Sequence, residues 1–383
     1  MKKNIMYIIL LVIIFTSIMC EKTFNEKISI SIALLTLTYG IKKMFFTAKE
    51  GQDSSIGAQA VNGFAIVASV NAWRLLHNAT AAKQRQKIIQ GGYYNSYYDL
   101  VGLWNKLFKE KNDSINIVPM GHATTMISCG NYTIMTDPLL NQCFPFQRCI
   151  EFPCDMKEII QPIDMILISH SHADHMDKNS INALYELNKS IQLIIPEGVP
   201  LKGIAIPKSQ IHTLSHHDEL KTHITAGSSA INITRVPAYH FSATGPFDYN
   251  EHECCGYVIS YKHSNNNTST IYFAGDTGYK DGLCEEIKNK FPHIDIAIMP
   301  IAPACPASLM HNAFHTNPND IMHMLKILKP NHFFPIHWGT LSQGAHWEVD
   351  IIKWMKKNIE TLKKDGITID MHFIIGKIYS LFS

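Results

Sequence analysis

The stretch Ser169-His170-Ser171-His172-Ala173-Asp174-His175 is the most informative part of the chain, because it places three imidazoles and one carboxylate within six positions. Neutral imidazole and carboxylate are suitable ligands for Zn²⁺ and its first-row neighbours. A single tetrahedral ion can hardly use so many ligands from one short turn, so the pattern predicts two ions. We expect the first two histidines to bind one ion and the Asp-His pair to bind the other, in a hydrolytic two-metal site.

The residues before this motif, Asp164 to Ser169, form an apolar run that is typical of a buried strand. The histidines therefore follow the C-terminal end of a core strand, where α/β sheets place their chemistry. The chain contains 20 histidines among 383 residues, so a polar loop with chance histidines is the alternative. The position directly after a strand favours the metal site.

Two ions need further protein ligands, because catalytic zinc usually takes about three. His240, Asp276 and His337 each follow an apolar, strand-like run. Any one of them alone is equally well explained as a loop residue. As an ordered series after the first motif, they predict the missing ligands.

Several sequence blocks around these candidates resemble the metallo-β-lactamase-fold hydrolases. Within them the chain is most similar to the branch of N-acyl-phosphatidylethanolamine-hydrolysing phospholipase D. The blocks are Gly121-His122-Ala123-Thr124, Thr136-Asp137-Pro138, Phe273 to Tyr279, Met299-Pro300-Ile301 and Pro335 to Thr340. The resemblance implies an α/β (α+β) fold of the αββα sandwich type, in which helices flank two mixed β-sheets.

The resemblance also implies two sets of three metal ligands and one bridging carboxylate. They are His170, His172 and His240 for one ion, Asp174, His175 and His337 for the other, and Asp276 as the bridge. The expected catalytic residues are Asp174 and Asp276, together with His315, which matches a histidine near the substrate phosphate. The alternative for His315 is a helix-entry residue, since Asn317 and Pro318 form an N-cap and first helical turn.

His122 and Asp137 are expected to contact the ligating side chains without binding the ions themselves. Ligating histidines usually donate their second N–H to a carboxylate or a carbonyl, and Asp137 follows a strand-like run that could present its carboxylate in this way. The alternative for Asp137 is a turn starter before Pro138.

The implied cofactors are two divalent metal ions, with zinc as the default and manganese or iron as alternatives. The implied reaction is hydrolysis of N-acyl-phosphatidylethanolamine or a related phospholipid to phosphatidic acid and an N-acylethanolamine, by water activated between the ions. The chain departs from the phospholipase pattern after His240 and after Ile301. A soluble lactone or cyclic phosphodiester therefore stays an alternative substrate, and a non-enzymatic, membrane-tethered binding protein is a third hypothesis.

Composition excludes other classes of function. The formal net charge is +2 and no long basic run occurs, which argues against a nucleic-acid partner. The chain has no Gly-x-Ser-x-Gly motif and no phosphate-binding loop, so covalent serine catalysis and nucleotide-driven chemistry lack support. Cys143, Cys149 and Cys154 lie close together in a loop, either as a disulfide pair with one thiol or as plain thiols.

We expect three segments along the chain. Residues 1–50 form a signal or membrane-anchor segment, residues 51–112 a helical extension, and residues 113–383 the hydrolase domain. Membrane contact is expected through residues 5–41, which hold two apolar runs flanked by lysines. The protein would then be membrane-associated or, if the first run is cleaved, exported. The oligomeric state stays open, with a homodimer as one option.

Overall fold

The computed structural model describes residues 81–95, 97–109, 113–130, 132–143, 146–159, 163–216, 219–223, 230–242, 252–303, 315–342 and 348–382. The expected anchor segment, residues 1–50, lies outside this range, and so do residues 51–80 of the expected helical extension. The rest of that extension contains a helix over residues 81–90 and helix α4 (Tyr97–Lys109). Within the described residues, no helix combines the length and the apolarity needed to cross a bilayer.

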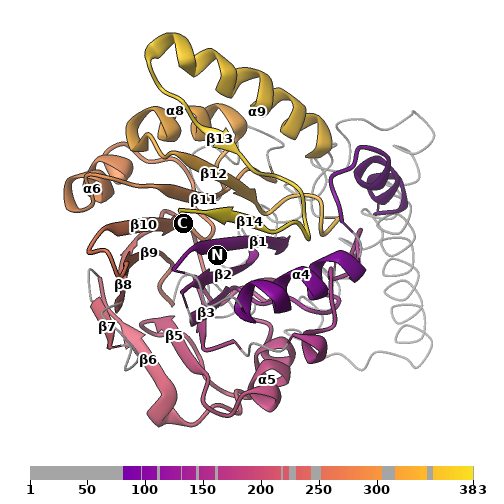
Figure 1. Cartoon of the computed structure of the whole chain (residues 1–383), viewed down its shortest axis with the longest axis vertical. Helices are drawn as coiled ribbons and strands as arrows, with labels where there is room; N and C mark the ends of the chain where they lie inside the picture. The colour runs from indigo at the N-terminus through magenta and orange to yellow at the C-terminus, as the bar shows by residue number, and fades with distance from the viewer. Residues whose placement is uncertain are drawn as a thin grey trace, which may run out of the picture.

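Two seven-stranded sheets lie face to face at the centre of the described structure (Figure 1). The first has the order β14-β1-β2-β3-β4-β5-β6 and the second β13-β12-β11-β10-β9-β8-β7. The strands of the first sheet are β1 (Ile115–Gly121), β2 (Thr124–Cys129), β3 (Tyr132–Thr136), β4 (Met165–Leu167), β5 (Gln192–Pro196), β6 (Ile211–Leu214) and β14 (Tyr379–Leu381). Those of the second are β7 (Glu219–His223), β8 (Ala230–Pro237), β9 (Cys255–Lys262), β10 (Thr268–Phe273), β11 (Ile296–Pro300), β12 (His332–Ile336) and β13 (Asp370–Met371).

Both sheets are mixed in the same way. The pairs from β14 to β3 are antiparallel and those from β3 to β6 are parallel. In the second sheet, the pairs from β7 to β10 are antiparallel and those from β10 to β13 are parallel. The parallel halves matter for function, because the loops that leave their C-terminal ends meet at one edge of the sandwich.

Helices cover the outer faces of both sheets (Figure 1). Helices α4 and α5 (Lys178–Leu187) lie against the first sheet, and α6 (Leu283–Lys290), α8 (Pro318–Leu328) and α9 (Glu348–Leu362) lie against the second. Three short 3-10 turns complete the described elements: η1 (Met156–Glu158), η2 (Lys208–Gln210) and η3 (Lys363–Asp365). The expected αββα sandwich is thereby confirmed.

The core consists of three apolar layers, one between the sheets and one under each helical layer. Between the sheets, Ile134, Leu167, Tyr257 and Ile298 are among the fully or almost fully buried side chains. Strands covered on both faces need apolar residues at successive positions, which explains the continuous run at β4 and β11. Burial of each such aliphatic side chain contributes about 1.5–3 kcal/mol.

Local sequence signals agree with the observed helix ends. The Asn317 side chain accepts hydrogen bonds from the backbone of Asn319 and Asp320, while the Asp320 carboxylate accepts from the Asn317 N–H, and Pro318 opens α8. This is a capping box with proline at the first position, so the predicted N-cap is confirmed.

The three clustered cysteines are buried thiols. Cys143, Cys149 and Cys154 form no disulfide in the described structure. Burial raises the pKa of the Cys143 and Cys154 thiols to about 12, which keeps both protonated at neutral pH. Of the two alternatives that the sequence left open, the structure has plain thiols.

Candidate metal centre

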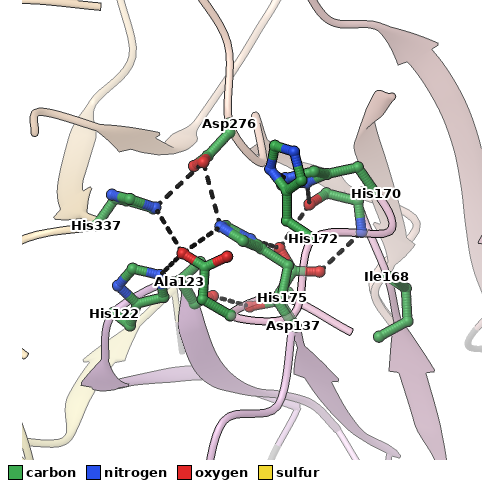
Figure 2. A network of polar contacts seen from close by, with 12 residues as sticks. His122, Ala123, Asp137, Ile168, His170, His172, His175, Asp276 and His337 are labelled. Atoms are coloured by element: carbon green, nitrogen blue, oxygen red, sulfur yellow. Dashed lines mark hydrogen bonds and ion pairs between the residues drawn. The ribbon is translucent and has the colours of Figure 1, made fainter. Parts of the chain in front are cut away.

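The side chains singled out in the sequence lie together where strands of both sheets end. Figure 2 shows His122, Asp137, His170, His172, His175, Asp276 and His337 among them. The loop that carries Ser169 to His175, called the motif loop below, follows β4 of the first sheet. Asp137 follows the neighbouring strand β3. His240, Asp276 and His337 follow β8, β10 and β12 of the second sheet. The site is therefore assembled from strand ends of both sheets, and it exists only when the two sheets pack face to face.

The carboxylate of Asp276 faces both His175 and His337 (Figure 2). Its Oδ2 is 3.1 Å from Nε2 of both His175 and His337, 3.8 Å from Nε2 of His240 and 3.6 Å from Nδ1 of His315. Burial opposes its charge, but the histidines outweigh it and hold the pKa of Asp276 well below its usual range. One ionised oxygen thus faces histidines from both expected ligand sets.

The expected first ligand set is brought together in space. Nε2 of His170 is 2.8 Å from Nδ1 of His172, which in turn is 3.3 Å from Nε2 of His240. The ligand atoms of these three residues all lie within 4.8 Å of one another. This spacing suits three nitrogens around a single ion.

The expected second set is also brought together, with one addition. The ligand atoms of Asp174, His175 and His337 lie within 4.8 Å of one another, and those of His122 belong to the same group. Nε2 of His122 is 3.0 Å from Oδ2 of Asp174. His122 was expected to contact the ligands without being one of them, whereas its ring nitrogen lies among the ligand atoms of this group.

Buried atoms without hydrogen-bond partners support a metal at this place. In the described structure, Nε2 of His175, Nε2 of His337 and Oδ1 of Asp276 are buried and make no hydrogen bond of acceptable geometry. Unsatisfied buried polar atoms are costly, so several of them converging on one place indicate a missing partner. Imidazole nitrogens and carboxylate oxygens fit a zinc-like divalent cation.

Burial keeps most of the clustered imidazoles neutral. It lowers the pKa of His122 and of His315 to about 3 and holds that of His170 well below its usual range. At His337, nearby carboxylates led by Asp276 outweigh burial and raise the pKa to about 9. A neutral imidazole offers a lone pair, and metal binding displaces the proton from a charged one. At His175, Asp276 and the other nearby carboxylates likewise hold the pKa well above its usual range, so the two histidines nearest the Asp276 carboxylate are charged in the metal-free protein.

The Asp137 carboxylate holds the motif loop in place through hydrogen bonds to Ser169 and a close contact with His175. Its Oδ1 accepts a hydrogen bond from the Ser169 N–H (2.7 Å), and its Oδ2 accepts from the Ser169 hydroxyl (2.6 Å) and faces Nδ1 of His175 (2.7 Å). The Ser169 hydroxyl also lies 2.9 Å from Nδ1 of His170. Sequence reasoning named Asp137 but missed Ser169, although a hydroxyl residue directly before a candidate ligand is a signal that could have been used.

The backbone around the site adopts conformations that few residues tolerate. His122, Asp137 and His337 all have positive φ, at 54°, 33° and 62°. Such conformations cost free energy in non-glycine residues and cluster at functional sites. Gly275, at φ 59°, approaches so closely that a Cβ there would lie 2.4 Å from Cβ of Ser169. Glycine before Asp276 therefore lets the loops of the two sheets meet.

Comparison with known proteins agrees with this geometry. Residues 132–338 match the family model described as "Beta-lactamase superfamily domain". The chain is 29% identical over 252 residues to "N-acyl-phosphatidylethanolamine-hydrolyzing phospholipase D, mitochondrial" of Saccharomyces cerevisiae, a match that covers 62% of this chain and 51% of the yeast protein. The chain thus spans about half the length of that curated relative.

Two further matches extend the comparison. A metal-dependent hydrolase of Pelotomaculum thermopropionicum is 28% identical over 228 residues, covering 58% of this chain and 83% of the relative. The crystal structure of "a possible metal-dependent hydrolase" from Veillonella parvula superposes with a TM-score of 0.51 and 17% identity, covering 70% of this chain and 100% of that one. The structural likeness concerns the fold alone, whereas the family model covers more than half of the sequence. The chain therefore belongs to the β-lactamase superfamily and has the metallo-β-lactamase fold.

Proposed function

We propose that this chain is a metal-dependent hydrolase with two divalent ions, acting on a phosphodiester of the N-acyl-phosphatidylethanolamine type. The observation that carries the proposal is the position of Asp276, whose Oδ2 faces His175 and His337 at 3.1 Å and His240 at 3.8 Å. A carboxylate that faces two ligand groups at once suits a bridge between two ions.

The residues that would hold the two ions are those of the two ligand groups and the bridge. They are His170, His172 and His240; Asp174, His175 and His337; and Asp276. Bound divalent ions, zinc by default, lower the pKa of a water ligand and neutralise charge that develops on a phosphoryl group.

Two residues of the chain would act on the substrate side. Asp174 can accept a hydrogen bond from a water molecule at the site, and its Oδ2 also lies 3.0 Å from Nε2 of His122 and 3.7 Å from Nε2 of His337. His315 lies 3.6 Å from Asp276, and its side chain is 13% exposed, so it is less deeply buried than Asp276. A neutral imidazole there can donate one N–H to a phosphoryl oxygen.

Replacement of His315 by alanine is expected to lower kcat by roughly 10²-fold, at the low end of general acid–base contributions, while both metal ions stay bound. Steady-state kinetics and metal analysis of the same samples check this. His323→Ala is the matched control, because His323 is an exposed histidine of the neighbouring helix α8. An unchanged kcat in His315→Ala would remove this residue from the proposed chemistry.

The substrate is tested by incubating metal-reconstituted protein with N-acyl-phosphatidylethanolamine in detergent and identifying products by mass spectrometry. Phosphatidic acid and N-acylethanolamine, both absent with an Asp276→Ala variant, are the expected products. A protein that holds two ions and releases neither product would retain the metal centre but not the lipid substrate.

A soluble lactone or cyclic phosphodiester is the second candidate substrate. It stays a candidate because the Pelotomaculum relative, whose name states a metal-dependent hydrolase without a substrate, matches over 83% of its length, against 51% of the yeast phospholipase. The metal ligands would be the same, and the sequence after His240 and after Ile301, where the chain departs from the phospholipase pattern, would set the difference. The assay above separates the two if both substrate classes are offered to the same preparation.

The apolar runs within residues 5–41 would bring the protein to a membrane, which suits a phospholipid substrate. Deletion of residues 1–50 is expected to shift the protein from the membrane pellet to the supernatant after ultracentrifugation of cell lysate. The full-length chain is the reference for this comparison. Continued pelleting of the shortened but folded protein would contradict anchorage by this segment.

A further inference from the structure

The peptide unit of Tyr239, directly before His240, is held at both of its polar groups by the loop that carries Asp276. The Tyr239 N–H donates to Oγ1 of Thr277 (2.9 Å), and the Gly278 N–H donates to the Tyr239 carbonyl (2.6 Å). Thr277 is the residue after Asp276 and is fully buried. Hydrogen bonds to the loop that carries Asp276 thus fix the backbone directly before His240.

The same threonine also holds the segment that carries His315. The Thr316 N–H donates to the Thr277 carbonyl (2.9 Å), and the Thr316 hydroxyl donates to the Pro300 carbonyl at the end of β11 (2.7 Å). The Thr277 hydroxyl donates its own hydrogen to the Gly278 carbonyl (2.9 Å). Its one hydrogen and one of its lone pairs are therefore both used.

We propose that Thr277 is a positioning residue whose hydroxyl sets His240 at ligand distance from Asp276. Three loops that leave three different elements converge on this one residue, and His240, Asp276 and His315 form a group whose ligand atoms lie within 4.8 Å of one another. The inference rests on the proposed metal centre and adds the means by which one half of that centre is aligned.

The other half of the site has an equivalent arrangement at Thr340, which supplies a matched comparison. The His122 N–H donates to Oγ1 of Thr340 (2.5 Å), and the His337 N–H donates to the His122 carbonyl (2.8 Å). Thr340 is also fully buried. The Thr277 hydroxyl accepts a hydrogen bond from the backbone next to His240, whereas the Thr340 hydroxyl accepts one from His122, whose carbonyl holds His337. The two threonines should therefore affect different ions.

The test is a titration of metal-free protein with Zn²⁺ in competition with a chromophoric chelator, which yields a dissociation constant for each of two ions. Thr277→Val keeps the shape of the side chain but removes the hydroxyl. It is expected to weaken one constant roughly 10–100-fold, the range typical for partners of metal ligands, and to leave the other unchanged. Thr277→Ser retains the hydroxyl and should keep both constants. Thr340→Val should weaken the constant that Thr277→Val leaves intact.

A double-mutant cycle assigns the affected ion. In a His240→Ala background, Thr277→Val should cause little further loss of metal affinity, whereas in a His337→Ala background it should cause its full effect. Faster hydrogen exchange of the Tyr239 amide in metal-free Thr277→Val protein checks the hydrogen bond itself, and an unchanged far-ultraviolet circular dichroism spectrum checks the fold.

The outcomes separate this inference from the proposed function. If the wild-type protein binds two ions and Thr277→Val binds both with unchanged constants, the positioning role is wrong while the metal centre stands. If the Thr277→Val effect is equally large in the His240→Ala and His337→Ala backgrounds, the residue acts on the whole site and the specific role is wrong. If the wild-type protein binds fewer than two ions, the proposed metal centre is overturned and this inference with it.

Discussion

Replacement of Asp276 by alanine is expected to cost the protein at least one of its two metal ions. It should also lower kcat/KM by roughly 10³-fold or more, which is at least the rate loss seen when an enzyme loses one group that stabilises charge in the transition state. The reason is the shared position of this carboxylate, whose Oδ2 lies 3.1 Å from both His175 and His337. Its removal would leave two positive ions close together without the buried negative charge that the histidines now surround.

Metal analysis and kinetics on one preparation measure both effects of this substitution. Asp281→Asn is the control, because Asp281 is an exposed carboxylate five residues further along, paired with the Tyr279 hydroxyl at 2.8 Å. It changes the charge of the same loop without touching the cluster, so metal content and rate should stay as in the wild type. Two bound ions and full activity in Asp276→Ala would remove the bridge from the proposed site.

Replacement of Asp137 by alanine is expected to lower the free energy of unfolding by about 3–5 kcal/mol, as for other buried charges that lose their partner. Asp137 is fully buried and accepts from the Ser169 backbone and hydroxyl while facing His175. Alanine would leave those donors without an acceptor and would also place a poorly tolerated residue at φ 33°.

Urea unfolding of metal-free protein measures this loss, because bound metal would otherwise add its own stabilisation. Asp177→Ala is a graded control that removes the N-cap of α5 and should cost about 1 kcal/mol. Asp137→Asn keeps an acceptor and tolerates positive φ, so its loss should lie between the two. A loss for Asp137→Ala no larger than that for Asp177→Ala would contradict a supporting role for the buried carboxylate.

Much of the fold could be predicted because its signals are local. The apolar runs at β4 and β12 and the cap at Asn317 each depend on a few neighbouring residues. The candidate ligands could be found for the same reason, since each follows such a run. Their grouping into an αββα sandwich came from the resemblance of several blocks to a known family, and the structure has that architecture.

Other features depended on contacts between distant segments. Thr277 is 38 residues from Tyr239, and Thr340 is 218 residues from His122, so neither pair has a local pattern that could reveal it. The approach of Gly275 to Ser169 joins loops of different sheets. Whether the clustered cysteines form a disulfide also depends on the tertiary structure, which their spacing along the chain does not determine.

By itself, the sequence determined which residue types follow which strands, because hydrophobic periodicity and metal-ligand chemistry are properties of short segments. Only the tertiary structure decided which of those side chains meet. It brought His122 to 3.0 Å from Asp174, set Asp276 between His175 and His337, and made most of the imidazoles neutral by burying them together. Distances and pKa values at this site arise from two sheets packed face to face, and that packing sums many weak contacts that no single segment contains.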